Sequence, residues 1–345
     1  MMEGRWKSRA SRMLGLTPIS NRSLPPLVLL CAALSLTSAM PVGAEQNYPT
    51  RPIRFVVPSS PGGSLDTLAR TIGPRLGDQL GQQIVVDNRA GGNGRIGMEI
   101  VAQSRPDGYT IVVAYISNLA IAPSLYAKPP FDPVKDFAPI TQIASSPNIL
   151  TVHPSVPARN LQEFLALVKA KPGQVSFAST GVASVGHLTG ELLNSLAGIK
   201  MVHVPYKGGG QAIIDLVGGH VQVMFSGFSA VMPHIKSGKV RALAVTGKER
   251  SPALPNVPSL GEQGFPGVEM TAWYGMLGPA GTPRPIAARL QDETAKILKA
   301  PEVVHKLDGL GFEIVASTPE EFAVYIKSEI AKWAKVVKAS GAKAE

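Results

Sequence analysis

The sequence contains a single cysteine, Cys31, among 345 residues. Cys31 lies in an apolar run, 24–40, which follows a basic stretch and precedes Val42-Gly43-Ala44, a sequence typical of a signal-peptidase site. We therefore expect residues 1–44 to be a cleaved signal peptide and the mature protein to begin near Glu45. A mature chain without cysteine excludes disulfides, thiolate metal sites and a cysteine nucleophile.

Two other interpretations of this leader are weaker. A lipid-anchored protein would need a small residue directly before its cysteine, and Leu30 stands there instead. A permanent transmembrane helix is disfavoured because the apolar run contains Pro25 and Pro26 and ends at a cleavage sequence. The long basic leader leaves two candidate translation starts, Met1 and Met13.

Clusters of like charge are also lacking. The net charge is +10, and residues 1–44 carry five Lys or Arg against one acid, so the mature chain lies near +6. These charges are spread along the chain, and aromatic residues make up only 6% of it. Nucleic-acid-binding proteins concentrate Lys and Arg with interleaved aromatics, so we expect no nucleic acid. A mildly positive surface suits a small anionic ligand. A surface whose charges are simply solvated would show the same excess of positive charge.

Catalytic and metal-binding motifs are missing too. No HExxH, CxxC or GxSxG occurs, and the six histidines lack the spacing of metal ligands. The sequence therefore gives no indication of a metal site. Gly92, Gly94 and Gly97 match GxGxxG, but residues 114–120 hold no acid where a dinucleotide site would place one. These glycines are better interpreted as a tight turn with close helix packing.

What the sequence does contain is an alternation of short apolar runs with helical periodicity. Residues 53–58, 83–88 and 110–116 have the pattern of strands, and 64–80 and 94–104 that of helices. This βαβ rhythm predicts a parallel sheet. The rhythm returns further along, with strands predicted at 175–179, 201–204, 221–225 and 240–245.

Two long strands, at 140–152 and 269–277, are predicted to connect two such lobes. The tail holds too few strands for a domain of its own, so we expect it to complete the first sheet. The predicted α/β architecture has a first lobe at 45–146 plus 270–345 and a second at 147–269, with a ligand cleft between them. Ligands of such sheets bind beyond the carboxyl ends of the strands.

Three strand-to-helix turns are candidates for anion binding. The first, 59–66, carries two glycines and leads into a helix whose N-terminal amides and dipole favour an anion. An ordinary βα loop capped by Ser64 is the alternative. Thr180 and Gly181 lead similarly into a helix near Ser184, and the third turn is 206–210. Turns from both lobes would form a two-sided anion clamp.

Longer stretches of the chain resemble a known family. The segments are YPTRPIRFVVPSSPGGSLDTLAR, VVDNRAGGNGRIG, PDGYT, PSLYAKPPFDPVKDFAPI, VPYKGGGQAIIDLVGGHVQ, PHIKSGKVRALAV and WYGMLGPAGTP. Together they resemble the Bug family, the TctC-like solute-binding proteins of tripartite tricarboxylate transporters. The resemblance runs from about Tyr48 to the C-terminus.

The resemblance implies a type II-like, two-lobe periplasmic binding protein that closes on a small carboxylate and delivers it to the membrane subunits of a tripartite transporter. It implies no enzyme activity and no cofactor, and we expect a monomer. The ligand-binding residues that it implies are Ser60, Pro61, Gly62, Gly63, Ser64, Asp66, Thr180, Gly181, Ser184, His187 and Tyr206.

The sequence departs from the family pattern at three places. Ser59 stands where an aromatic residue is common, Asn118-Leu119-Ala120-Ile121-Ala122 replaces a frequent THAIN stretch, and Ser226 replaces a common acid. The missing acid weakens the case for a ligand with an ammonium group. Two alternative functions are a ligand sensor that docks on a membrane receptor and a periplasmic enzyme. The enzyme would depend on Ser184 and His187 as a nucleophile–base pair.

Overall fold

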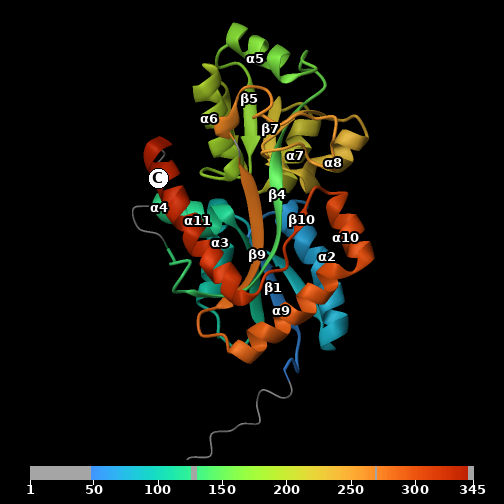
Figure 1. Cartoon of the computed structure of the whole chain (residues 1–345), viewed down its shortest axis with the longest axis vertical. Coiled ribbons are helices and arrows are strands. Elements are labelled where there is room, and N and C mark those ends of the chain that lie inside the picture. The colour runs from blue at the N-terminus through green and yellow to red at the C-terminus, as the bar shows by residue number, and fades with distance from the viewer. Residues whose placement is uncertain (1–47, 126–129, 269, 341–345) are drawn as a thin grey trace, which may run out of the picture. The chain divides into compact units, whose positions relative to one another are not determined.

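The computed structural model describes residues 48–125, 130–268 and 270–340 (Figure 1). The predicted signal peptide, 1–44, with Cys31 and Met13, lies outside the described residues. All described residues belong to one compact unit, Glu45–Glu345. None of the helices in the described ranges is long and apolar enough to cross a membrane.

The chain begins with three parallel strands, as predicted. β1 (Ile53–Val57) lies between β2 (Ile84–Asn88) and β3 (Thr110–Tyr115). The four apolar side chains of β1 are buried, whereas Arg54 is partly exposed. The connections are α2 (Ser64–Leu80), which ends at Gly81 in the left-handed conformation, and α3 (Arg95–Ala102).

Two antiparallel strands link the two halves of the sheet. β4 (Phe137–Val152) pairs with β9 (Thr271–Pro279) from Phe137 to Pro147, and then with β7 (Val223–Gly227) from Asn148 onward. β9 pairs in turn with β3. Figure 1 shows these long strands running side by side through the centre of the molecule. Both predicted connections between the two halves are therefore present, and the two strands pair with each other in antiparallel orientation.

The second half repeats the parallel pattern. β7 pairs with β5 (Ser176–Ser179), and β5 with β6 (Val202–Pro205), while β8 (Arg241–Val245) pairs with β4. The strand order is β2-β1-β3-β9-β4-β7-β5-β6. The covering helices are α5 (Leu161–Ala170), α6 (Val185–Ala197), α7 (Gly209–Val217) and α8 (Phe228–Lys236). The predicted α/β class is confirmed, whereas the bounds of the lobes stay a prediction.

The C-terminal segment returns to the first half. α9 (Arg284–Lys299) and α10 (Pro301–Asp308) lead to β10 (Glu313–Ile314), which pairs with β4 at Ser145 and Ala144. α11 (Pro319–Ser340) follows. The helical segments η2 (Ser117–Ile121), a π turn, and α4 (Ala122–Leu125) were not predicted, nor were the short turns η1 (Gly92–Gly94) and η3 (Pro266–Val268).

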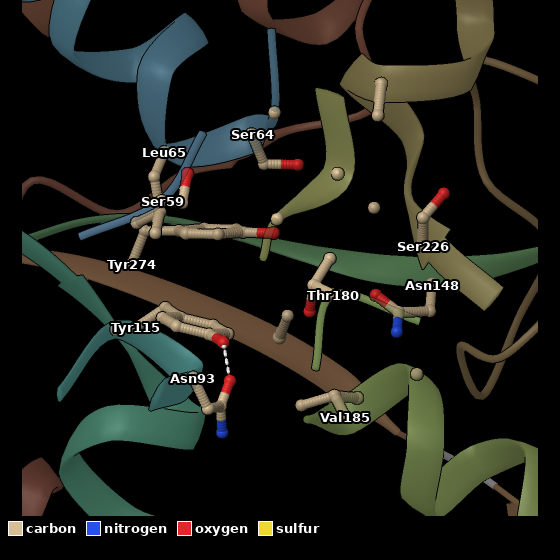
Figure 2. Close-up of a pocket in the computed structure, with 18 of the residues that line it drawn as sticks. Ser59, Ser64, Leu65, Asn93, Tyr115, Asn148, Thr180, Val185, Ser226 and Tyr274 are labelled. Carbon is tan, nitrogen blue, oxygen red and sulfur yellow. Dashed lines mark hydrogen bonds between the residues drawn. The ribbon is translucent and has the colours of Figure 1, made fainter. Parts of the chain in front are cut away.

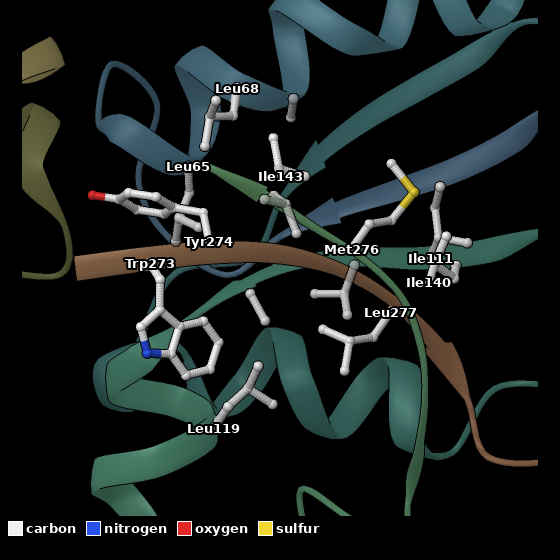
Figure 3. Packing of buried hydrophobic residues seen from close by; sticks show 14 of the residues in the cluster. Leu65, Leu68, Ile111, Leu119, Ile140, Ile143, Trp273, Tyr274, Met276 and Leu277 are labelled. Carbon is white, nitrogen blue, oxygen red and sulfur yellow. The ribbon is translucent and has the colours of Figure 1, made fainter. Parts of the chain in front are cut away.

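The largest core cluster lies around the first half of the sheet. Figure 3 shows Leu65 and Leu68 of α2 on one side of β4 and β9, and Leu119 of η2 on the other. Two further clusters lie in the second half, one built around α5 and the other around α7 and α8. Both faces of the sheet are therefore buried.

A buried carboxylate holds α11 against β9. Glu329 is only 6% exposed, and its Oε2 accepts hydrogen bonds of 3.0 Å from the indole nitrogens of Trp273 and Trp333. Its Oε1 accepts one of 3.1 Å from Lys332. Because Trp273 belongs to a crossing strand, this network supports the connection between the halves.

We predict that Glu329→Ala lowers the free energy of unfolding by about 2–5 kcal/mol, because two buried indole N–H groups lose their acceptor. Glu329→Gln retains one oxygen acceptor and should cost less. Urea unfolding followed by tryptophan fluorescence measures both changes. Glu320→Ala, at an exposed position of the same helix, is the control and should cost no more than about 1 kcal/mol. Equal losses for Glu329→Ala and the control would contradict the prediction.

Candidate functional site

A cavity lies at the carboxyl ends of the parallel strands. It holds about 630 Å³ of space, partly open to solvent. Its walls come from the turns that follow β1, β2, β5, β6 and β7, and from the crossing strands through Asn148 and Tyr274. Figure 2 shows Ser64 and Tyr274 on one side of this space and Ser226, Thr180 and Asn148 on the other. This is where ligands bind in α/β sheets.

The first predicted turn meets the cavity with Gly63 and Ser64. Gly63 precedes α2 in an extended conformation with no side-chain cap. Ser64 Oγ accepts a 2.8 Å hydrogen bond from Ser229 and also bonds to the Tyr274 hydroxyl. Burial raises the pKa of Tyr274 to about 12, so this phenol stays protonated at neutral pH.

The other predicted residues of this turn support it from behind. Asp66 is buried and does not line the cavity. Its oxygens accept hydrogen bonds from the Gly62 nitrogen at 3.0 Å, from Arg70 at 2.9 Å and from Asn88 at 3.0 Å. Gly62 has φ +85°, which a side chain would strain. Asp66 therefore shapes the turn and leaves no oxygen aimed at the cavity.

Backbone approaches backbone where this turn meets the turn after β6. The Ser60 nitrogen donates to the Lys207 carbonyl oxygen at 3.3 Å. A Cβ built on Gly63 would lie 3.5 Å from the Gly209 nitrogen, and one built on Gly210 would overlap the Pro61 carbonyl oxygen. Gly210 thus permits this close contact, whereas a Cβ on Gly63 would make only an ordinary van der Waals contact.

The second predicted turn meets the cavity at Thr180 and at the start of α6, through Val185 and Gly186. The Val185 nitrogen donates to Ser117 Oγ, in the first half of the chain, at 3.2 Å. Gly181, Ser184 and His187 lie behind this wall and do not line the cavity. Ser184 caps α6 by accepting a 3.3 Å bond from the His187 backbone nitrogen.

Tyr206 also lies outside the lining. Its hydroxyl donates to Asp215 at 2.6 Å, and burial together with this bond raises the pKa of Tyr206 to about 12. Ser184 and His187 do not form a nucleophile–base pair, because Ser184 Oγ meets the His187 backbone and the His187 ring accepts from Ala183. This geometry argues against the enzyme that the sequence left open.

Sequence reasoning missed several lining side chains: Asn93, Tyr115, Asn148 and Tyr274. Ser226, which the sequence singled out as a departure from the family pattern, also lines the cavity. The Tyr115 hydroxyl donates to Asn93 Oδ1 at 2.5 Å (Figure 2). Asn93 belongs to the glycine-rich turn that was interpreted as structural. The others lie within or at the ends of strands, where the apolar pattern carries no sign that a polar side chain faces a cavity.

The lining combines apolar surface with several polar side chains and is almost uncharged. Among the described residues that form it, Lys207 alone carries a charged side chain, and none is acidic. Ser226 Oγ is buried without a hydrogen-bond partner within the described chain. No group of three or more His, Cys, Asp or Glu side chains among the described residues could hold a metal ion.

Comparison with protein-family models matches residues 68–342 to the Tripartite tricarboxylate transporter family receptor. The chain belongs to this family. BugT of Bordetella pertussis is 38% identical over 306 residues, which cover 88% of this chain and 94% of BugT. The resemblance to the Bug family is therefore confirmed.

Solved structures of family members share the two-lobe fold. The periplasmic binding protein BugD superimposes with a TM-score of 0.83 at 34% identity, covering 86% of this chain and 100% of BugD. A protein described as R. palustris Rpa4515 with adipate gives 0.82 at 34% identity, covering 85% and 98%. Members of the family are periplasmic solute-binding proteins rather than enzymes.

We predict that Gly210→Ala weakens ligand binding at least tenfold, or by about 1.4 kcal/mol, because its Cβ overlaps the Pro61 carbonyl oxygen in the closed arrangement. The overlap is with backbone, so the two turns must separate, whereas alanine itself is compatible with the first turn of α7. Circular dichroism checks that the variant still folds. Calorimetric titration with a compound that a screen of small organic acids identifies as a ligand gives the affinity. Gly267→Ala, whose Cβ would meet only the tip of Leu196 at 3.4 Å, is the matched control. Wild-type affinity in Gly210→Ala would show that this contact is not needed.

Proposed function

We propose that the protein captures a small carboxylate outside the cytoplasm and delivers it to the membrane subunits of a tripartite tricarboxylate-type transporter. One observation carries the proposal: three helices begin at glycines that line the same cavity. These glycines are Gly63 before α2, Gly208 before α7 and Gly227 before α8.

None of these three helices has a side-chain cap at its first residue. The first N–H groups of a helix lack partners within the helix, and the helix dipole places partial positive charge there. Three such ends around one cavity favour a negatively charged group. The glycines place no side chain at these helix ends, and they also permit close packing, because a Cβ would meet Ser60 at Gly208 and Ser64 at Gly227.

The charge of the lining supports an anion without an ammonium group. A bound ammonium would need an acidic partner, and the described lining has none. Lys207 adds positive charge at the same end as the glycine contact. Ser226 contributes a neutral hydroxyl where the family pattern commonly has an acid.

A second polar group of the ligand has partners on the opposite wall. Asn148, Thr180 and Ser226 lie together there (Figure 2), and the buried Ser226 hydroxyl lacks a partner within the described chain. Their amide and hydroxyl groups can donate hydrogen bonds to a second carboxylate or to a hydroxyl. The adipate in a related structure is a carboxylate of this kind. We therefore propose a dicarboxylate or a hydroxylated acid.

We predict that a thermal-shift screen of four- to six-carbon dicarboxylates gives at least one stabilising compound. At 100 times the dissociation constant, binding to the folded state adds about 2.7 kcal/mol. The compound should be recovered unchanged after incubation, and the matching diamines should have no effect. Stabilisation by diamines alone, or chemical conversion of the compound, would refute the proposal.

The proposal also requires export. We expect the protein purified from the periplasm to start near Glu45, which intact-mass measurement would show. A mass that includes residues 1–44, or an added lipid, would contradict it. Replacing Ala44 and Val42 by bulky charged residues should leave the uncleaved form in the cell, because the cleavage sequence is lost.

A further inference from the structure

We infer that His187 and His203 are positioning residues for ligand binding: stacked on each other as a neutral pair, they hold the turn 181–184 in the shape that forms one wall of the cavity. The inference rests on the proposed function of that cavity. It gives His187 a role different from the ligand contact that the sequence implied.

The two imidazole rings form part of a stack between α6 and the sheet. Their centroids lie 3.9 Å apart with 22° between the ring planes. The other neighbour of His203 is Phe177 of β5, at 4.9 Å and 30°. His187 belongs to α6 and His203 to β6, so the stack joins β5, β6 and α6 behind the turn.

Each histidine holds one part of the turn by a hydrogen bond. The Ala183 nitrogen donates to His187 Nδ1 at 3.0 Å, and Ala183 has φ +65°, which is strained for a residue with a side chain. His203 Nε2 bonds to Ser179 Oγ at 2.7 Å. Ser179 Oγ also donates to the Gly181 carbonyl oxygen at 2.9 Å. The pair therefore holds both parts of the turn by hydrogen bonds, including the strained backbone at Ala183.

The turn stands directly behind the cavity wall. Thr180 precedes it and Val185 follows it, and both line the cavity. Ser184, its last residue, caps α6, and Val185 bonds across the cleft to Ser117. Releasing the turn would move Thr180 and the first turn of α6 together, and with them the wall that faces the ligand.

Only a neutral His187 can act in this way, because Nδ1 must be unprotonated to accept from Ala183. Burial lowers the pKa of His187, with a smaller opposing effect from Glu191, one turn further along α6. Burial, and then the neighbouring His187, lowers the pKa of His203 to about 4. Glu191 is the titratable group that acts on His187, and His187 is the one that acts on His203.

The sign of the pH effect follows from these shifts. Both folded-state pKa values lie below the ordinary value of 6.5, so the folded form binds fewer protons than the unfolded chain. Protonation therefore opposes the folded turn. Its stability is highest above pH 6.5 and falls as the pH decreases toward about 4.

Nuclear magnetic resonance of the ligand-free protein tests the pair without any ligand. We expect His187 Nδ1 to be unprotonated at pH 7.5. The protection factor of the Ala183 amide, corrected for intrinsic exchange, should fall as His187 becomes protonated. An Ala183 amide whose protection does not follow the titration of His187, or a His187 already protonated at pH 7.5, would overturn the inference.

Variants add the link to binding, with adipate as the probe. His187→Leu should weaken adipate binding about fivefold or more, because the Ala183 N–H loses its acceptor. His187→Asn places an amide oxygen near the Nδ1 position and should restore affinity while removing the pH dependence of Ala183 protection. His305→Asn, at an exposed position of α10, is the control.

Circular dichroism of each variant checks that the chain still folds. Equal affinity in His187→Leu and wild type would overturn the positioning role. A wild type that fails to bind adipate or any other dicarboxylate would count against the proposed function, and the Ala183 measurement would still decide whether the pair holds the turn.

Discussion

Close contact between two backbone turns determines the shape of the cavity. The turn 61–63 meets the turn 208–210 without an intervening side chain, because a Cβ on Gly210 would overlap the Pro61 carbonyl oxygen. This approach brings the first turn of α2 beside those of α7 and α8. A residue larger than glycine at Gly210 would separate the halves and open the cavity.

Gly63, Gly208 and Gly227 leave three helices without side-chain caps, at a cost of about a few tenths of a kcal/mol each relative to a serine or aspartate cap. Such a departure from local stability is typical of a functional site. Burial elsewhere compensates it: both faces of the sheet are covered, and Glu329 ties α11 to the crossing strand β9. In the proposed complex, the carboxylate of the ligand supplies negative charge at the helix ends.

The sequence predicted the elements better than the directions of side chains. α2 begins and ends at the predicted residues, and β4 and β9 cross between the halves as expected. These features could be predicted because apolar periodicity and helix-ending glycines lie within the segment that they describe. Asp66 and His187, which the resemblance implied as ligand-binding residues, hold turns by hydrogen bonds and do not line the cavity. Asn148 and Tyr274 were missed, since a strand pattern does not show which polar residue faces a cleft formed by distant segments. The lobe bounds and the ligand-binding residues stay predictions.

The central claim is that helix-terminal backbone amides, and not a side-chain charge, hold a carboxylate in this cavity. A crystal structure of the protein with a dicarboxylate bound tests it most directly. We predict carboxylate oxygens within about 2.7–3.2 Å of amide nitrogens in the first turns of α2, α7 or α8, with the second polar group toward Asn148 and Ser226. A ligand held chiefly by the Lys207 ammonium, or bound outside the cavity, would contradict the claim.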